Sequence, residues 1–463
     1  MKYNLSVKEF LEKRKNGEID YNDFYSTFLT NLKRKNKELR ALRVISHSQK
    51  GDLNKGKLYG LPISVKDNIC VKGVESCAGS KILEGYIPPF DASCISNVKK
   101  NSGAIIGKTN QDEFGFGTFS TNSGFDIPLN PLDKTRVAGG SSGGSAAIVA
   151  GLDMPHVSLG ESTGGSISCP SAFCSVVGLT PTYGLVSRYG LIDYANSLDK
   201  IGVIGKTVYD TALLLSIIAG HDEKDFTTIN KKAEDYTNYC GPDVPKKIKL
   251  GVPKEYFSDD IDKRIRDEVW NSIHYLESIG IDYEECSLKM TRYALPAYYI
   301  IAMAESSTNL AKFCGLRYGL QADPTENFNN YFSKIRSKGF GEEAKRRIIL
   351  GTFARMSGFR DAYYLRAMKV RTLVIDEYKR LFKKYYALIS PTMPIFPPKI
   401  KDVKKISPIQ CYMSDILTVP PNLAGMPMIS VPSSVPSVGI HIVADHLQEG
   451  RIIKIAYLLE NRC

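Results

Sequence analysis

The chain has 463 residues, of which 43% are apolar and 24% charged, as in soluble globular proteins with a large core. Residues 1–20 are charged throughout and do not read as a signal peptide, and no apolar stretch reaches the roughly 18 residues of a membrane span. We therefore expect a cytoplasmic protein without a membrane partner. The net charge of +12 is compatible with solvated helix faces and does not by itself indicate a nucleic-acid site.

The predicted elements alternate between helix and strand along the whole chain. In the first half they are helices over 6–17 and 21–44, strands over 61–69 and 103–110, a helix over 145–151 and a strand over 157–160. In the second half they are a strand over 247–253, a helix over 261–279, mostly helix over 341–382, strands over 386–391, 427–432 and 438–444, and a helix over 448–460. This interleaving predicts an α/β layered fold, and no spacer of low complexity divides it.

Ten cysteines are spread between Cys70 and Cys463, and none forms a Cys-x-x-Cys pair. Zinc sites and disulfide frameworks have tighter, repeated spacings. We therefore expect reduced thiols, most of them buried, and no metal site.

A glycine- and serine-rich stretch over 139–165 contains a G-x-S-x-G pattern that centres on Ser142. In an α/β-hydrolase this pattern marks the nucleophile, which follows a strand directly and needs a histidine further along the chain. Here the preceding residues read as a loop, and the late histidines, His441 and His446, lie next to the predicted terminal helix. The hydrolase interpretation is therefore disfavoured.

Three longer motifs offer a better interpretation. They are LYGLPISVKDNI at 58–69, AGGSSGGSAA at 138–147 and GESTGGSISCPSAFCSVVGLTPTYG at 160–184. Together, and in this order, they resemble the amidase signature family. The resemblance implies one amidase domain over 1–463, with a central mixed β-sheet covered by helices on both faces. Its parts would be a helical segment over about 1–45, a catalytic core over about 55–230 and a glutamine-site half over about 245–463.

Amide cleavage needs a nucleophile, a base that passes its proton to the leaving nitrogen, and donors for the oxyanion. A lysine can be the base if burial lowers its pKa from the usual value of about 10.4. Lys66 lies at the end of the apolar run from Leu61 to Val65, where such burial is expected.

The resemblance assigns the catalytic roles. Lys66 matches the buried base, Ser141 the relay serine that follows a cis peptide bond, and Ser166 the nucleophile that forms the acyl-enzyme. The oxyanion hole falls on backbone N–H groups around the nucleophile, at Thr163, Gly164, Gly165 and Ser166. Glycine suits that position because the backbone can then approach the substrate closely.

The chain departs from the family pattern in two places. The family usually carries an aspartate two residues before the GGS sequence and an arginine two residues after its serine, and these positions are Ser162 and Ser168 here. Because both charges of the expected buried pair are absent together, we predict that the protein still folds, with looser support under Ser166. Ser141 and Ser166 are also one residue further apart than the family pattern, which leaves Ser142 as an alternative relay serine.

The second half resembles the A subunit of the tRNA-dependent amidotransferases, through the segments 295–319, 339–364 and 411–432. That family is the glutaminase component of a complex that amidates Glu-tRNA(Gln) or Asp-tRNA(Asn). The resemblance implies that ammonia passes to a B subunit, which binds most of the tRNA and uses ATP with Mg²⁺, and that a small C subunit wraps the pair. No cofactor is implied for this chain.

Free glutamine carries a carboxylate and an ammonium, so its site needs a cation and an anion. By resemblance, Arg347 and Asp415 match these groups, and Tyr298 matches a further residue of the glutamine site. The neighbouring Arg346 competes with Arg347 for that role. The remaining alternatives are a stand-alone amidase of small amides and a scaffold subunit that has lost activity, although the three catalytic positions are retained.

Overall fold

An eleven-stranded mixed sheet runs through the computed structural model, which describes residues 3–46, 53–54, 56–232, 234–323 and 327–462. In spatial order the strands are β1 (Leu42–Ile45), β3 (Ala104–Thr109), β2 (Pro62–Lys66), β4 (Val157–Ser162), β6 (Lys200–Gly205), β5 (Val177–Thr180), β10 (Met428–Pro432), β11 (Gly439–Val443), β9 (Ala387–Pro391), β7 (Lys249–Pro253) and β8 (Asp282–Cys286). The α/β prediction and the mixed sheet are thereby confirmed.

Strand direction fixes where the polar ends of the strands meet. Strand β2 pairs in parallel with both β3 and β4, with Val65 opposite Leu159. All three strands are buried along their whole length, including the polar residues at their carboxyl ends. Because neighbouring parallel strands end at the same edge of a sheet, Lys66 at the end of β2 lies beside Glu161 near the end of β4.

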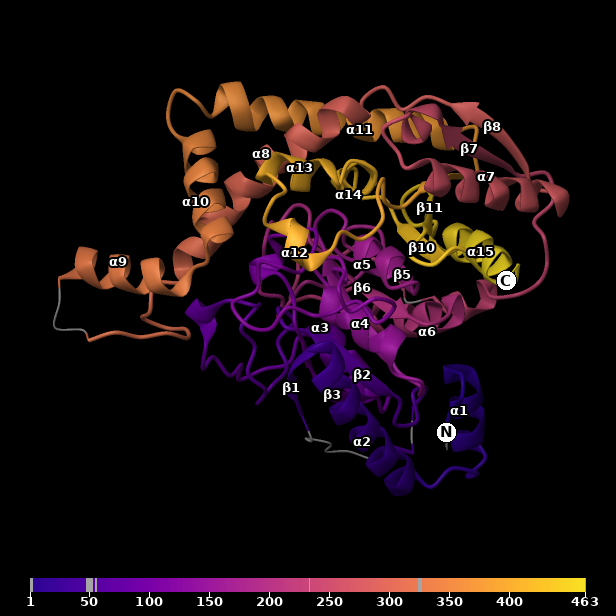
Figure 1. The fold of residues 1–463 in the computed structure, drawn as a ribbon, viewed down its shortest axis with the longest axis horizontal. Coiled ribbons are helices and arrows are strands. Elements are labelled where there is room, and N and C mark those ends of the chain that lie inside the picture. The colour runs from indigo at the N-terminus through magenta and orange to yellow at the C-terminus, as the bar shows by residue number, and fades with distance from the viewer. Residues whose placement is uncertain (1–2, 47–52, 55, 233, 324–326, 463) are drawn as a thin grey trace.

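Helices cover both faces of this sheet (Figure 1). In one group α4 (Gly143–Gly151) packs on β2 and β4, α5 (Ser168–Phe173) packs on β5 and β10, and α2 (Tyr21–Leu39) packs outside them on α4. The other group consists of α1 (Val7–Lys15), α3 (Ser93–Lys100), α6 (Val208–Ile218), α7 (Lys263–Ser278) and α15 (Glu449–Glu460). Helix α4 is made of small and apolar residues because it is buried almost all round.

A third group of helices lies across the top and left of the view in Figure 1. It consists of α8 (Thr291–Asn309), α10 (Glu342–Arg355), α11 (Arg366–Phe382) and α14 (Val419–Leu423), and α8 contacts the other three. Helix α9 (Phe328–Gly339) projects at the left, and the short helices α12 (Ile400–Val403) and α13 (Pro408–Met413) complete the group. Residues 342–382 are helical apart from a turn near residue 360 and a π-helical turn at Asp361–Leu365, as predicted.

The predicted helix over 21–44 is wrong in its last residues, because α2 ends at Leu39 and the chain continues into β1. Arg40 has a left-handed backbone, with φ of 53°, and the Asn36 side chain bonds both the N–H and the carbonyl of Leu42. This local hydrogen bonding turns the chain out of the helix, although the apolar spacing alone fitted a longer one. The division into helical, catalytic and glutamine-site segments stays a prediction.

The cysteines of the described residues are free thiols, and most of them are buried, whereas Cys463 lies outside the described residues. None of the helices in the described part of the chain combines the length and apolar character that crossing a bilayer requires.

Candidate active site

Lys66 is a fully buried lysine with polar partners on three sides. Its Nζ donates to Ser141 Oγ at 2.7 Å, to the Glu161 backbone carbonyl at 2.8 Å and to Glu161 Oε2 at 2.9 Å. Burial lowers the pKa of Lys66 below its usual value, and the negative charge of Glu161 opposes that shift. The lysine is therefore placed to exchange a proton with Ser141.

The two adjacent serines of the glycine-rich stretch have different partners. The Gly140–Ser141 peptide bond is cis, and Ser141 Oγ receives the Lys66 bond. Ser142 precedes α4 and donates from its Oγ to the Glu161 carbonyl at 3.1 Å, whereas the three bonds of the lysine amine go to Ser141 and Glu161. The geometry thus favours Ser141 over Ser142 as the relay serine.

Ser166 lies in the tight turn between β4 and α5 and is 6% exposed. Its carbonyl accepts a hydrogen bond from the Ser142 N–H at 3.1 Å, which ties the two serine segments together. Among the described residues its hydroxyl has no hydrogen-bond partner. An unengaged hydroxyl beside the Lys66–Ser141 pair is free to meet a substrate, and catalytic hydrogen bonds often tighten only when the substrate is bound.

The residues before Ser166 leave backbone donors available. In the described part of the chain, the N–H groups of Gly164 and Gly165 make no hydrogen bond to the protein. A Cβ at Gly165 would lie 2.4 Å from Thr418 Oγ1, and one at Gly164 would lie 3.0 Å from the Tyr298 hydroxyl. A side chain at Gly165 would require Thr418 to move and one at Gly164 would be tightly packed, so glycine allows this close approach, and the two unbonded N–H groups are candidate donors to an oxyanion.

Hydroxyl groups occupy the two positions where the family usually has charges. Ser162 Oγ accepts from the Ser166 N–H at 3.1 Å and donates to the Gly164 carbonyl at 2.9 Å. Ser168 Oγ lies 3.5 Å from Nε2 of the buried His441. The turn that carries Ser166 is thus held by neutral hydrogen bonds, and a buried carboxylate stands one residue earlier, at Glu161.

Arg347 of α10 is buried, with 3% exposure, in a cage of aromatic rings. Its guanidinium carbon lies 4.9–5.6 Å from the ring centroids of Phe116, Tyr194, Tyr299 and Tyr412. Its Nε donates to Glu343 Oε1 at 2.8 Å, and its Nη1 bonds the Tyr194 hydroxyl. The side chain of Arg346 is 40% exposed, so Arg347 is the arginine that faces the interior.

Asp415 is the buried anion of the same region. Its Oδ2 accepts from Thr118 Oγ1 at 3.0 Å and from the Tyr299 hydroxyl at 2.9 Å. Burial raises the pKa of Asp415 to about 6. Its Oδ1 lies 3.5 Å from where a Cβ at Gly165 would be. This carboxylate is therefore next to the residue that precedes Ser166 in the sequence.

Tyr298 connects the two groups of residues. Its hydroxyl donates to Thr163 Oγ1 at 3.1 Å, and its ring packs edge-on against Tyr299 at 4.9 Å between centroids. The sequence-predicted residues therefore fall into two adjoining clusters. One contains Lys66, Ser141, Ser166 and the glycine turn, and the other contains Tyr298, Arg347 and Asp415.

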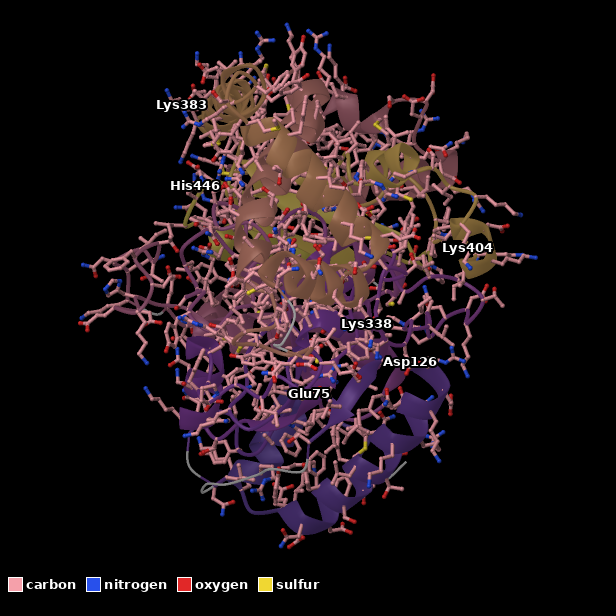
Figure 2. The ribbon with its side chains drawn as sticks, turned by 90° about the vertical axis from the view of Figure 1, so that its left-hand side faces the viewer. Glu75, Asp126, Lys338, Lys383, Lys404 and His446 are labelled. Atoms are coloured by element: carbon pink, nitrogen blue, oxygen red, sulfur yellow. The ribbon has the colours of Figure 1, made fainter. Side chains whose placement is uncertain are left out.

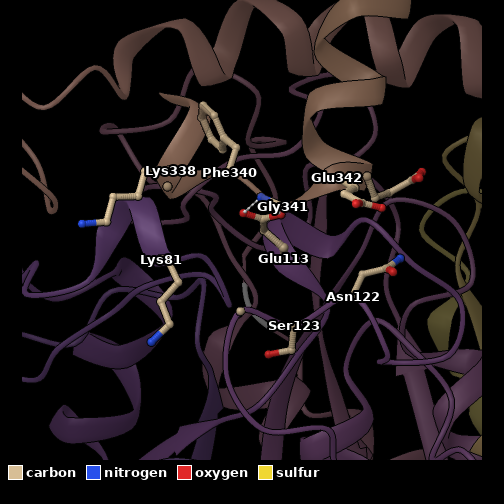
Figure 3. A pocket seen from close by; sticks show the side chains of 11 residues that line it. Lys81, Glu113, Asn122, Ser123, Lys338, Phe340, Gly341 and Glu342 are labelled. Carbon is tan, nitrogen blue, oxygen red and sulfur yellow. Dashed lines mark hydrogen bonds between the residues drawn. The ribbon is translucent and has the colours of Figure 1, made fainter. Parts of the chain in front are cut away.

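A pocket of about 480 Å³ opens beside Arg347 of the second cluster. The residues that line it include Thr118, Arg346, Arg347, Lys404 and Tyr412. A second pocket, of about 260 Å³, shares Asn122, Glu342 and Glu343 with it. Figure 2 looks onto this face and labels Lys404 of the first pocket and Lys338 of the second. Figure 3 shows Glu113 of the second pocket accepting the N–H of Gly341, with Lys81 and Lys338 to one side.

Sequence reasoning missed several residues of both clusters. In the first cluster it missed Glu161, which contacts Lys66. In the second it missed the residues that bond Arg347, which are Tyr194 and Glu343, and those that bond Asp415, which are Thr118 and Tyr299. A signal existed for Glu161, because an ionisable residue at the end of a predicted buried strand is rarely buried without a partner. The aromatic cage residues gave no comparable signal, since tyrosine is common in ordinary cores. Among the described residues, no group of His, Cys, Asp and Glu side chains is arranged to hold a metal ion.

Comparisons with known proteins place this geometry in a family. Residues 6–453 match the Amidase family. The A subunit of glutamyl-tRNA(Gln) amidotransferase from Halothermothrix orenii is 44% identical over 99% of this chain and 97% of its own length, and that of Methanococcoides burtonii is 48% identical over 88% and 85%. The crystal structure of the same subunit from Thermotoga maritima is 36% identical, with a TM-score of 0.83 over 99% of this chain and 94% of that one. The chain therefore belongs to the amidase family and, within it, to the A subunits of the glutamyl-tRNA(Gln) amidotransferases.

Proposed function

We propose that this chain is the glutaminase subunit of a tRNA-dependent amidotransferase. It would cleave the side-chain amide of glutamine through an acyl-enzyme on Ser166 and release ammonia to a partner. The observation that carries the proposal is the hydrogen bond from buried Lys66 to Ser141, beside the turn that holds Ser166. The adjoining pair of buried charges, Arg347 and Asp415, fits the two ends of a free amino acid.

The chemical steps follow from these positions. Ser166 Oγ attacks the amide carbon while its proton passes to Ser141, whose own proton passes to Lys66. The N–H groups of Gly164 and Gly165 stabilise the oxyanion that forms on the former carbonyl oxygen. The proton returns through Ser141 to the departing nitrogen, which leaves as ammonia. Water then hydrolyses the γ-glutamyl ester by the same route.

Recognition of the amino acid falls to the second cluster. A guanidinium presents a planar fork of donors that matches a carboxylate, so Arg347 would bind the α-carboxylate of glutamine. Asp415 would accept the α-ammonium, and Tyr298 would close the side of the site next to Thr163. Because Asp415 lies beside Gly165, an amino acid held at both ends extends its side chain toward Ser166.

The relatives of this chain are named as subunits, so the chain belongs to a family of multi-subunit enzymes. We propose a B subunit that carries most of the tRNA contact and the ATP with Mg²⁺, and a small C subunit, with no cofactor in this chain. The complex would work in the cytoplasm and convert Glu-tRNA(Gln), Asp-tRNA(Asn) or both.

Trapping the acyl-enzyme tests the proposal. The full-length protein is mixed with glutamine, quenched in acid and analysed by mass spectrometry of its peptides. We expect the peptide that contains Ser166 to gain one glutamyl group, and Ser166→Ala to lose both this adduct and ammonia release. A stand-alone amidase would form adducts with simple amides and show no preference for glutamine, and a scaffold subunit would form none.

A further inference from the structure

Glu161 is a buried carboxylate in direct contact with the lysine base. It lies in β4, is 1% exposed, and brings Oε2 to 2.9 Å from Lys66 Nζ. Its backbone carbonyl accepts a second bond from the same amine at 2.8 Å and one from Ser142 Oγ at 3.1 Å. Asn68 Nδ2 donates to Oε2 at 3.0 Å. One residue thus supplies two of the three acceptors around the lysine.

The number of acceptors matters because Lys66 must change its protonation state. A protonated amine has three N–H donors, and the three oxygens around Nζ satisfy all of them. A neutral amine has two N–H donors and one lone pair. If the two N–H groups stay on the backbone carbonyl and on Oε2 of Glu161, the lone pair of the amine faces Ser141 Oγ. Glu161 therefore orients the amine in the form that accepts a proton.

We infer that Glu161 is a positioning residue for the base, which aims the lone pair of Lys66 at Ser141 and stabilises the ammonium formed on proton transfer. The inference rests on the serine-based amide cleavage proposed above. As Ser166 Oγ bonds to the substrate carbon, its O–H bond breaks and the proton moves to Ser141 Oγ. The Ser141 O–H breaks in turn, an N–H forms on Lys66, and the positive charge appears 2.9 Å from the Glu161 carboxylate.

Two other carboxylates face Lys66, but their oxygens are engaged elsewhere. Asp112 accepts the N–H groups of Ser120 and Asn122, and Asp199 accepts those at residues 194 and 195. The negative charges of both favour the protonated form of Lys66, but each has a smaller effect than the charge of Glu161. Glu161 is thus the acid that contacts the amine directly.

The second oxygen of Glu161 supports a role beyond structure. Oε1 is buried and has no hydrogen-bond partner among the described residues, and the same holds for Oδ1 of the adjoining Asn68. Burying an ionisable group with an unsatisfied oxygen is costly, and such groups gather at functional sites. Removing this carboxylate alone would leave the buried Lys66 amine without its counter-ion.

The position of the pH profile tests the inference, because Lys66 must be neutral to act as a base. Without the negative charge of Glu161, burial lowers the pKa of Lys66 further, so the acid limb of the rate profile moves to lower pH. The same loss makes Lys66 a weaker base and leaves its ammonium unpaired. We therefore expect Glu161→Gln to shift the acid limb down by about one pH unit or more and to lower the plateau rate about 10- to 100-fold.

The experiment measures labelling of Ser166 in the full-length protein by a fluorophosphonate, which reacts with activated serines whatever their natural substrate. The label is located by peptide mass, and its rate is followed from about pH 5 to 10. Glu161→Asp should restore part of the plateau and move the limb back toward the wild-type position. The control is Glu449→Gln, which removes another fully buried carboxylate that is bonded to Thr182. Its acid limb should stay at the wild-type pH.

The outcomes separate this inference from the proposed function. A Glu161→Gln profile that coincides with the wild-type profile, or a limb at higher pH, overturns the inference. If Glu161→Gln does not fold, Glu161→Ser, which also lacks the carboxylate, replaces it, and a Glu161→Ser profile that coincides with the wild-type profile overturns the inference. If the labelling profile shifts as expected while glutamine releases no ammonia, the inference stands and the glutaminase proposal fails.

Discussion

The two clusters of the candidate site treat their buried charges differently. In the catalytic cluster, Lys66 already has its counter-ion, since Glu161 bonds it at 2.9 Å. In the second cluster, Arg347 and Asp415 make no ion pair with each other in the described part of the chain. Arg347 forms an ion pair with Glu343 at 2.8 Å inside its ring of aromatic side chains, whereas Asp415 accepts hydrogen bonds from hydroxyl groups alone.

This difference shows what each cluster is built to do. A base that gives and takes a proton needs a constant environment in both charge states, and the protein supplies it internally. A binding site gains affinity when the ligand supplies a missing charge, and Asp415 is the buried charge of the second cluster that has no counter-ion among the described residues. Each cluster therefore pairs its buried cation internally, and the unpaired charge among the described residues of the second cluster is that of Asp415, which the proposed glutamine ammonium would complement.

The largest expected effect comes from removing the base. Lys66→Ala should lower kcat for glutamine hydrolysis by about 10³-fold or more with little change in KM, because proton transfer is lost while the binding cluster is intact. Steady-state kinetics of ammonia release would measure it. A large rise in KM instead would mean that the two clusters do not have separate roles.

Arg347 should control binding. We expect Arg347→Ala to raise the glutamine KM on the order of 100-fold, because a buried guanidinium that bonds a carboxylate contributes a few kcal/mol. The matched control is Arg346→Ala, one residue away but on the exposed side, with an expected change of about twofold or less. Equal effects of the two substitutions would contradict the assignment.

The pH dependence of binding should report Asp415. Its pKa is raised to about 6, and only the ionised carboxylate attracts the glutamine ammonium. The KM for glutamine should therefore rise as the pH falls through about 6, by about tenfold for each further pH unit. In Asp415→Asn the KM should be high at every pH, and this limb should be absent. A limb that persists in the variant would assign the titration to another group.

Ser142→Ala should have the smallest effect, about threefold or less on kcat/KM. The Ser142 hydroxyl bonds the Glu161 carbonyl and not Lys66, whereas its backbone N–H, which holds the Ser166 carbonyl, is unaffected by the substitution. Ser141→Ala, measured beside it, should lose activity by about 100-fold or more. If the two variants exchanged these effects, Ser142 would be the relay serine.

Much of the catalytic cluster could be predicted because its residues lie in short segments with strong local constraints. In the GGS turn a side chain at Gly165 would collide with Thr418, and one at Gly164 would be tightly packed against Tyr298. Lys66 is the last residue of a strand that is buried along its whole length. The resemblance to amidases then connected the segments, so Lys66, Ser141 and Ser166 could be named together. Helix α2 was predicted too long, since hydrogen bonds of Asn36, rather than apolar spacing, end it.

The sequence by itself determined the α/β alternation, the family and the identity of the proposed catalytic residues, because these depend on local composition and motif order. Only the tertiary structure decided which partners surround them. The parallel register of β2 and β4 brings Glu161 to Lys66 across 95 residues of chain. Packing of α8, α10 and the segment at 412–415 encloses Arg347 in aromatic rings. Contacts between distant segments leave no local pattern, so the electrostatic environment of the site became visible only once the chain was folded.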